Sequence, residues 1–239
     1  MIFDFKKIKK QRMISGISVL FLLMPVLIYL FYADNVPAVT NAGTAAPILV
    51  IDPGHGGIDS GAIAADGSKE SDINLAIALK LRALAEFCGL DNALVRQEDI
   101  TMSDTPDYSE HRDLQRRAEI VNSKNNCVYI SIHQNCYPTG QPSGSLVIYS
   151  DRSDSEQLGK LTHSNLISSL NPDNRRIAEP ANDKYYVLSH VDCPAILVEC
   201  GFMSNFSEME RLKSPQYQTS VAAVLVASFI QYTQNAKYI

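Results

Sequence analysis

Two histidines and two glutamates lie at positions from which a protein could gather them for metal-assisted hydrolysis. His55, His133 and Glu199 each follow or end an apolar run that is typical of a buried strand, and Glu70 stands at the start of a predicted helix. Two imidazoles and one carboxylate can form a hydrolytic zinc site with a fourth position left for water. A second carboxylate can then move protons. These four residues together predict a metal-dependent hydrolytic centre.

The loop that carries His55 is rich in glycine, which lets the backbone turn sharply and lets a bulky ligand approach. Asp52 and Asp59 are candidates to accept a proton from His55 or to cap nearby turns. Taken alone, the loop could equally be a turn that holds an ordinary structural histidine. It lacks the Lys-Ser/Thr pair of a phosphate-binding P-loop and the glycine spacing of a dinucleotide fold.

The two glutamates also have structural interpretations. A carboxylate that ends an apolar strand, as Glu199 does, is costly to bury without a partner. It can be satisfied by a salt bridge to Arg117 or by a helix N-terminus, or it can be a general base whose pKa is raised by apolar surroundings. Glu70 by itself is typical of a first helical turn, where the helix dipole favours an acid.

Alternating strand and helix patterns predict a single α/β domain with a twisted, mostly parallel central sheet flanked by helices. Strands are expected at 48–52, 93–95, 128–133, 145–149, 185–188 and 195–199, and helices at 71–88, 114–125, 154–170 and from Pro215 onward. Ser71 is the expected N-cap of the first of these helices. In such sheets ligands bind beyond the carboxyl ends of the strands, which is where His55, His133 and Glu199 fall.

The N-terminal part of the chain has the pattern of a membrane anchor. Residues 1–33 combine a basic start with an uncharged, apolar stretch at 13–33, which is long enough to cross a bilayer core as a helix. We expect an uncleaved signal-anchor with the basic residues inside, so that the body faces the extracytoplasmic side. A cleaved signal peptide and a buried core helix are the alternatives. Residues 34–47 are the expected linker and 48–235 the expected catalytic domain.

Charge and cysteine content exclude some partners and sites. After the basic N-terminus the chain carries 16 basic and 25 acidic residues, a formal charge of −9 that argues against a nucleic-acid partner. The five cysteines have no metal-ligand spacing and are expected to be mainly small buried residues. A bridge such as Cys193–Cys200 stays open.

The four residues and the sequences around them resemble the zinc-dependent N-acetylmuramoyl-L-alanine amidases of the type 3 family. The matching sites are His55 in PGHGGIDSGA, Glu70, His133 in SIHQN and Glu199 in LVECGFMSN, and the resemblance runs from about residue 48 to the C-terminal helix. It implies that His55, Glu70 and His133 bind Zn²⁺ and that Glu199 is the catalytic acid/base. The implied reaction is hydrolysis of the amide between N-acetylmuramic acid and the L-alanine of the peptidoglycan stem peptide.

A finer resemblance, to the sporulation amidases of endospore formers, rests on the single anchor, the compact domain and the string CPAILVECGFMSN. It implies a role in spore cortex maturation through muramic-δ-lactam formation, a place at the cell membrane or in the forespore intermembrane space, and a lipoprotein activator as a further partner. Asn135, Arg117 and His190 are candidate substrate-binding residues.

Three other functions compete with this interpretation. A thiol hydrolase would use Cys136 or Cys200 with His133, although these cysteines end strands and lack the helix N-terminus that stabilises a thiolate. A non-catalytic peptidoglycan-binding module would keep the fold without turnover. A zinc carboxypeptidase acting within the stem peptide would share the same residue types.

Overall fold

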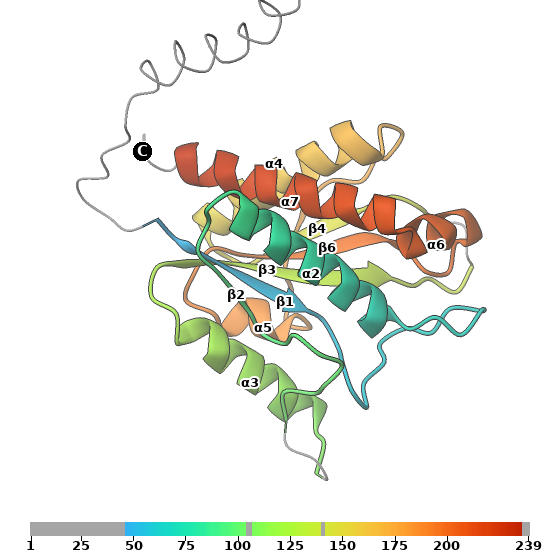
Figure 1. Ribbon diagram of the computed structural model, residues 1–239, viewed down its shortest axis with the longest axis horizontal. Helices are drawn as coiled ribbons and strands as arrows, with labels where there is room; N and C mark the ends of the chain where they lie inside the picture. Colours follow the sequence, from blue (N-terminus) through green and yellow to red (C-terminus); the bar gives the residue numbers. More distant parts are fainter. Residues whose placement is uncertain (1–45, 104–106, 140–141, 236–239) are drawn as a thin grey trace, which may run out of the picture. The chain divides into compact units, whose positions relative to one another are not determined.

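The computed structural model describes residues 46–103, 107–139 and 142–235. Within them, six strands form one sheet in the order β2-β1-β3-β6-β4-β5 (Figure 1). The strands are β1 (Ile48–Pro53), β2 (Asn92–Leu94), β3 (Cys127–Asn135), β4 (Leu146–Tyr149), β5 (Glu179–Pro180) and β6 (Ala195–Phe202). The helices are α2 (Glu70–Phe87), α3 (Glu110–Asn122), α4 (Ser153–Leu170), α5 (Tyr186–His190), α6 (Phe206–Lys213) and α7 (Pro215–Asn235).

The predicted α/β domain is confirmed, and its sheet is mixed. Strands β2, β1, β3 and β6 pair in parallel, whereas β4 runs antiparallel to β6. The carboxyl ends of β1, β3 and β6 therefore meet at one edge of the sheet. His133 of β3 lies directly opposite Glu199 of β6 in the strand register.

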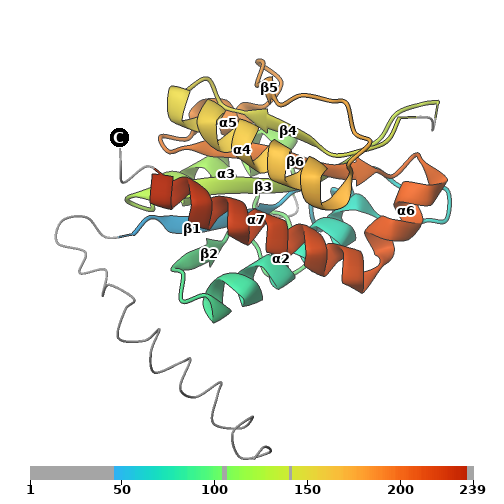
Figure 2. The ribbon, with the colours of Figure 1, turned by 90° about the horizontal axis from the view of Figure 1, so that it is seen from above.

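Helices cover both faces of this sheet (Figure 2). Helices α2, α4 and α7 pack beside one another on one face, and α3 and α5 lie on the other. Each face has its own apolar cluster, which explains why β1 and β3 are buried along nearly their whole length. Strands covered on both sides read as continuous apolar runs, as 48–52 and 128–132 do.

Two local predictions were wrong. The run 185–188 was expected to be a strand, but it contributes to α5, in which Val187 and Leu188 are buried against the second apolar cluster. A short apolar run has no period that separates strand from helix, so packing decides. Ser71 does not cap α2: the helix begins at Glu70, Lys69 occupies the cap position without a side-chain hydrogen bond, and the buried Ser71 hydroxyl has no partner among the described residues.

The predicted membrane anchor at 1–33 and nearly all of the linker at 34–47 lie outside the described residues, so these boundaries stay predictions. Among the helices that the structure does describe, none is both long and apolar enough to span a membrane.

Candidate active site

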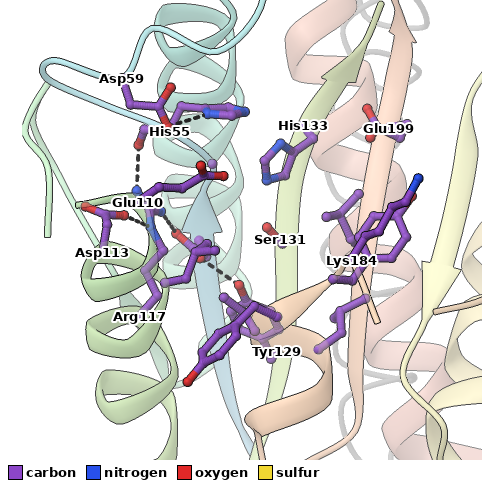
Figure 3. Close-up of a pocket in the computed structure, with 18 of the residues that line it drawn as sticks. His55, Asp59, Glu110, Asp113, Arg117, Tyr129, Ser131, His133, Lys184 and Glu199 are labelled. Carbon is purple, nitrogen blue, oxygen red and sulfur yellow. Dashed lines mark hydrogen bonds and ion pairs between the residues drawn. The ribbon is translucent and has the colours of Figure 1, made fainter. Parts of the chain in front are cut away.

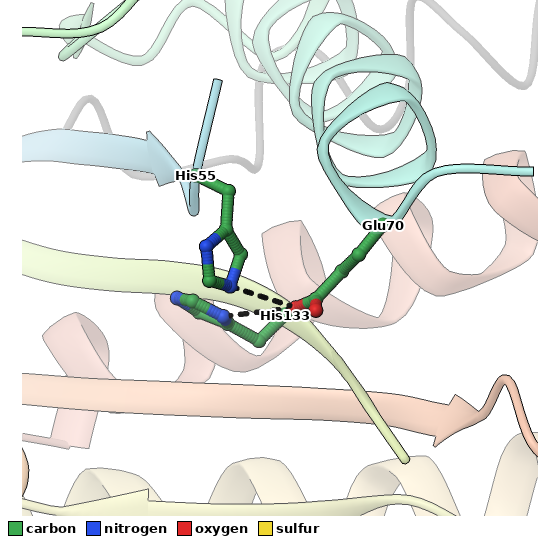
Figure 4. A group of neighbouring side chains, drawn as sticks. All are labelled: His55, Glu70 and His133. Atoms are coloured by element: carbon green, nitrogen blue, oxygen red, sulfur yellow. Dashed lines mark hydrogen bonds and ion pairs between the residues drawn. The ribbon is translucent and has the colours of Figure 1, made fainter. Parts of the chain in front are cut away.

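Three residues of metal-binding types converge at the carboxyl edge of the sheet (Figure 4). His55 lies in the loop after β1, Glu70 opens α2 and His133 lies on β3. Glu70 Oε1 is 3.3 Å from His55 Nε2 and 3.0 Å from His133 Nδ1, and one ligand atom from each residue fits within 4.8 Å of the others. This two-imidazole, one-carboxylate set has the size and chemistry of a hydrolytic zinc site.

The glycine-rich loop places His55 through close backbone contacts. His55 itself has a positive φ of 60°, which is strained for a residue with a side chain. Its Nδ1 donates a 2.7 Å hydrogen bond to Asp59 Oδ2, leaving Nε2 directed toward Glu70. A Cβ at Gly54 would come within 2.2 Å of the His133 ring, and one at Gly61 within 2.6 Å of Glu70 Oε2. Glycine is therefore required at both positions for the three ligands to meet.

Glu70 is fixed by backbone and amide donors that sequence reasoning missed. Its Oε2 accepts a 2.9 Å hydrogen bond from the Ala62 amide, and its Oε1 accepts bonds from the Gln134 amide and from Asn74 Nδ2. The Gln134 side chain in turn donates to Asn74 Oδ1. Asn74 lies one helical turn after Glu70, so the i, i+4 spacing was the available signal. Hydrogen bonds of this kind orient metal ligands and tune their basicity.

Hydrogen bonds within the cluster shift the pKa values of His55 and Glu70. Burial opposes the charged imidazolium of His55, but its hydrogen bonds to Asp59 and Glu70 outweigh burial and raise the pKa of His55 to about 10. Burial likewise opposes ionisation of Glu70, yet the hydrogen bonds from His133 and His55 hold the pKa of Glu70 far below its usual range. The cluster thus attracts positive charge strongly, which a divalent cation can supply in place of these protons.

Glu199 faces the cluster from β6 (Figure 3). Its Oε2 atom is buried and has no hydrogen-bond partner among the described residues. Burial, partly offset by the positive charge of His133, raises the pKa of Glu199 to about 7. The structural alternative for Glu199, a salt bridge to Arg117, does not form, since Arg117 pairs with Asp52 and Asp113. A buried carboxylate with one uncommitted oxygen and a pKa near neutrality is suited to general acid/base work.

A cleft of about 190 Å³ joins these groups. Its walls combine the catalytic candidates with aromatic and charged side chains from α3 and the segment before α5. These wall residues are Tyr108, Glu110, Asp113, Leu114, Lys184, Tyr185 and Tyr186. An open, mixed aromatic and polar cleft can accept a ligand that is larger and more polar than a small apolar molecule.

Arg117 contributes to the site through His55 rather than by an exposed guanidinium. It is buried, with 3% of its surface exposed, and its Nη2 donates to the His55 carbonyl at 2.7 Å. Its Nε and Nη1 donate to Asp113 and Asp52, and Asp52 also accepts a bond from the Tyr129 hydroxyl. Every guanidinium nitrogen thus already has an acceptor within the protein, which disfavours the predicted role of Arg117 in substrate binding.

The two other candidate substrate residues lie elsewhere. Asn135 ends β3 and its carbonyl accepts the Met203 amide, and its side chain does not line the cleft. His190 ends α5, is exposed and stacks on the cleft-wall residue Tyr186, but does not itself line the cleft. The predicted roles of both residues in substrate binding therefore stay predictions.

The cysteines proposed for a thiol mechanism are poorly placed. Cys200 is buried on the opposite face of β6 from Glu199, and burial raises the pKa of its thiol far above the usual range. Cys136 is exposed just after β3 and does not line the cleft. The Cys193–Cys200 bridge is excluded, because Cys193, two residues before β6, and Cys200, on β6, are buried in different apolar clusters on the two faces of the sheet.

Comparison with known proteins agrees with the geometry. The chain is 29% identical over 234 residues to the germination-specific N-acetylmuramoyl-L-alanine amidase of Bacillus subtilis, covering 95% of each protein. The CwlD amidase of Clostridioides difficile, solved in complex with the GerS lipoprotein, superposes with a TM-score of 0.75 at 33% identity, covering 79% of this chain and 98% of that one. The amidase AmiC2 of Nostoc punctiforme gives a TM-score of 0.70 at 31% identity, covering 80% and 99%.

The family match covers nearly the whole described part of the chain. Residues 49–231 match the N-acetylmuramoyl-L-alanine amidase family, a span that contains all four residues of the candidate site. The resemblance inferred from the sequence motifs is therefore confirmed, and the chain belongs to the N-acetylmuramoyl-L-alanine amidase family.

Proposed function

We propose that this protein is a zinc-dependent peptidoglycan amidase in which His55, Glu70 and His133 hold the metal and Glu199 transfers the proton. The bond cleaved is the amide between N-acetylmuramic acid and the L-alanine of the stem peptide. The observation that carries the proposal is the cluster of three ligand residues, two of which, His55 and His133, line the same cleft as Glu199, whose Oε2 is unpartnered among the described residues. Family membership supports the enzyme class.

The donor set fits zinc better than calcium or magnesium. Two imidazole nitrogens and one carboxylate oxygen suit Zn²⁺, whereas the alkaline-earth ions prefer oxygen donors alone. When bound, the cation polarises the scissile carbonyl and makes water a stronger acid. Asp59, Asn74 and the Gln134 amide keep the ligands oriented before and during turnover.

Glu199 performs the proton transfers. With its pKa near 7, its carboxylate is available to take a proton from the attacking water at neutral pH, and the resulting acid can return that proton to the departing amine. No hydrogen bond among the described residues ties Glu199 Oε2 to another group during these steps. His133, opposite Glu199 in the strand register, fixes the distance between the ligand set and the acid/base.

The finer role that we propose is maturation of the spore cortex, where peptide removal precedes muramic-δ-lactam formation. Support comes from the similarity to the germination-specific amidase and to the CwlD amidase. A lipoprotein activator is proposed by analogy with the GerS complex. We further propose that residues 13–33 anchor the chain in the membrane with residues 48–235 on the extracytoplasmic side, which includes the forespore intermembrane space.

The amidase proposal is tested by metal content and product analysis on the chain lacking residues 1–33. One zinc per chain is expected, together with free stem peptides released from purified peptidoglycan and identified by mass spectrometry. Release should stop on chelation and return with Zn²⁺. Product formed by fully metal-free protein would overturn the site assignment. Cleavage inside the stem peptide would replace the amidase by a carboxypeptidase.

If the chain binds zinc but releases no stem peptide, a candidate lipoprotein activator from the same organism is purified and added to the assay. Activity that appears only with that partner supports the activator proposal.

The cortex role is tested by muropeptide analysis of spores from a strain without this gene. Loss of muramic-δ-lactam supports it, and an unchanged cortex contradicts it while leaving the amidase chemistry intact.

A further inference from the structure

Two cysteines stand side by side at the beginnings of the two strands that carry His133 and Glu199. Strand β3 begins at Cys127, and Cys193 lies two residues before β6. Tyr129 pairs with Ala195 in the parallel register, and the Tyr129 amide donates to the Pro194 carbonyl. Continuing that register two residues back places Cys127 opposite Cys193.

The two cysteines share one apolar cluster and are shielded from solvent. The Cys127 thiol donates to the Val121 carbonyl at 3.8 Å. Cys127 is 5% exposed and Cys193 8% exposed, and both belong to the apolar cluster beneath α3 and α5. Neighbouring strands lie about 4.8 Å apart, within the Cα separation of about 4.4–6.8 Å that a disulfide spans. The pair takes no part in the cleft chemistry.

We propose that Cys127 and Cys193 form a disulfide bond that links the starts of β3 and β6 in the mature protein. The inference rests on the proposed extracytoplasmic location, where disulfides form and persist, and does not depend on amidase chemistry. The other cysteines offer no competing partner in the described structure, since Cys88 and Cys136 are exposed and Cys200 is buried in the opposite cluster.

The chemistry is thiol–disulfide exchange with an extracytoplasmic oxidoreductase in its disulfide form. The thiolate of one cysteine attacks the oxidant disulfide and forms a mixed disulfide, and the thiolate of the other cysteine then displaces the oxidant sulfur. Two protons and two electrons pass from the cysteine pair to the oxidant, which leaves as a dithiol. Because both sulfurs are buried in the folded domain, exchange occurs before the helices pack over them.

The bond would lock the register on which the active site depends. His133 follows Cys127 by six residues and Glu199 follows Cys193 by six, so all four side chains lie on the same face of the sheet. A slip of one residue between β3 and β6 would turn His133 and Glu199 to opposite faces of the sheet. A covalent link at the opposite end of both strands prevents that slip.

The test uses the full chain isolated from membranes of a host that exports it, with thiols trapped by N-ethylmaleimide in acid-quenched denaturant. We expect mass spectrometry to find a Cys127–Cys193 linked peptide and three alkylated cysteines. Reduction should lower the midpoint temperature of unfolding by roughly 5–10 °C. Cys127→Ser should abolish both the link and the shift, whereas Cys88→Ser should leave both unchanged.

In a second experiment, the same chain is refolded with oxidised and reduced glutathione. This tests whether the geometry of the fold allows the disulfide, independently of the cellular compartment. Failure of the linked peptide to form there, or formation of a different pair, overturns the proposal on geometric grounds. A link that forms in glutathione while the membrane-derived chain carries five alkylated cysteines overturns it as a native feature. An inactive preparation that retains the link supports the disulfide and counts instead against the proposed amidase function.

Discussion

At the scale of single residues, Glu199 differs from the carboxylates around it in having an oxygen left free. Asp52 and Asp113 share Arg117, and Glu70 is held by backbone and amide donors. Such pairing fixes a carboxylate and commits it to a structural task. Glu199 instead keeps an uncommitted atom in a place where desolvation raises its pKa, which is the usual way a protein prepares a general base.

Glu199→Gln should therefore remove turnover and spare the metal. Loss of a general acid/base lowers kcat by roughly 100- to 10,000-fold, whereas the ligand atoms of the metal cluster are untouched. Kinetics of stem-peptide release and zinc content by atomic spectroscopy measure the two effects separately. Glu179→Gln, the same substitution at an exposed position on β5, is the matched control and should retain activity. Loss of zinc from the Glu199 variant would show that Glu199 is a ligand.

The pH profile of kcat/KM should have an acidic limb. Burial raises the pKa of Glu199 to about 7 in the metal-free protein, and only the ionised form accepts a proton. Activity should thus rise tenfold per pH unit below the pKa and level off above it. A bound cation lowers this pKa, so the limb should lie at or below pH 7. An activity that keeps rising tenfold per unit above pH 8 would point to a different base.

At the scale of elements, the site depends on how closely the loop after β1 approaches α2 and β3. Gly54 and Gly61 make that approach feasible, because added Cβ atoms would overlap the His133 ring and the Glu70 carboxylate. Arg117 of α3 holds the same loop by donating hydrogen bonds to the His55 carbonyl and to Asp52 of β1. Helix α3 thus acts as a support for one metal ligand without touching the metal site.

Gly54→Ala should disrupt metal binding more than it disrupts the fold. The new methyl would lie 2.2 Å from His133 Nε2, so the ring must turn out of the cluster. We expect zinc affinity, measured with a competing chelator, to fall by at least tenfold. Gly89→Ala is a useful comparison, since Gly89 has a φ of 69° but open space around it. That variant should lose about 1 kcal/mol of stability and no affinity.

Arg117→Met should be strongly destabilising. It leaves Asp52 and Asp113 buried without their partner, which costs about 3–5 kcal/mol for a buried ion pair broken on one side. The free energy of unfolding in urea measures the loss. Arg116→Met, one residue earlier on α3, breaks an exposed pair with Glu119 and should cost less than about 0.5 kcal/mol. Equal losses for the two variants would mean that the buried network contributes little.

At the scale of the whole molecule, metal binding and folding are coupled. The three ligands come from segments separated by up to 78 positions, His55 to His133, and meet only when the sheet and α2 are assembled. A cation that binds the folded chain alone therefore stabilises the entire domain. Metal ligands must be unprotonated, so zinc competes with protons for His55, whose pKa is raised by its hydrogen bonds to Asp59 and Glu70.

Zinc should accordingly raise the unfolding temperature of the described domain. At a free concentration 100 times the dissociation constant, binding contributes about 2.7 kcal/mol, which corresponds to roughly 5–10 °C. Differential scanning calorimetry with and without zinc gives the shift directly. His133→Ala should abolish it, because one ligand is missing. A full shift in that variant would place the zinc elsewhere.

Much of the fold and the identity of the four site residues could be read from the sequence. Apolar runs fixed the positions of β1, β3 and β6, because strands covered on both faces must be apolar throughout. The parallel arrangement then implied that His55, His133 and Glu199 would share one edge. Helices α4 and α7 were predicted almost to the residue, since both begin at clear signals and carry a long periodic pattern.

The tertiary structure alone decided how those residues are held. Neither the bond from Arg117 to Asp52 nor the bonds from Gln134 to Glu70 and Asn74 follow from local sequence, because they join residues 60 to 65 positions apart. Packing of Val187 and Leu188 also favoured a helix at 186–190. The register of β3 with β6 placed Cys127 opposite Cys193. Residue types and strand ends set the chemistry that is available, whereas long-range packing sets which atoms remain free to perform it.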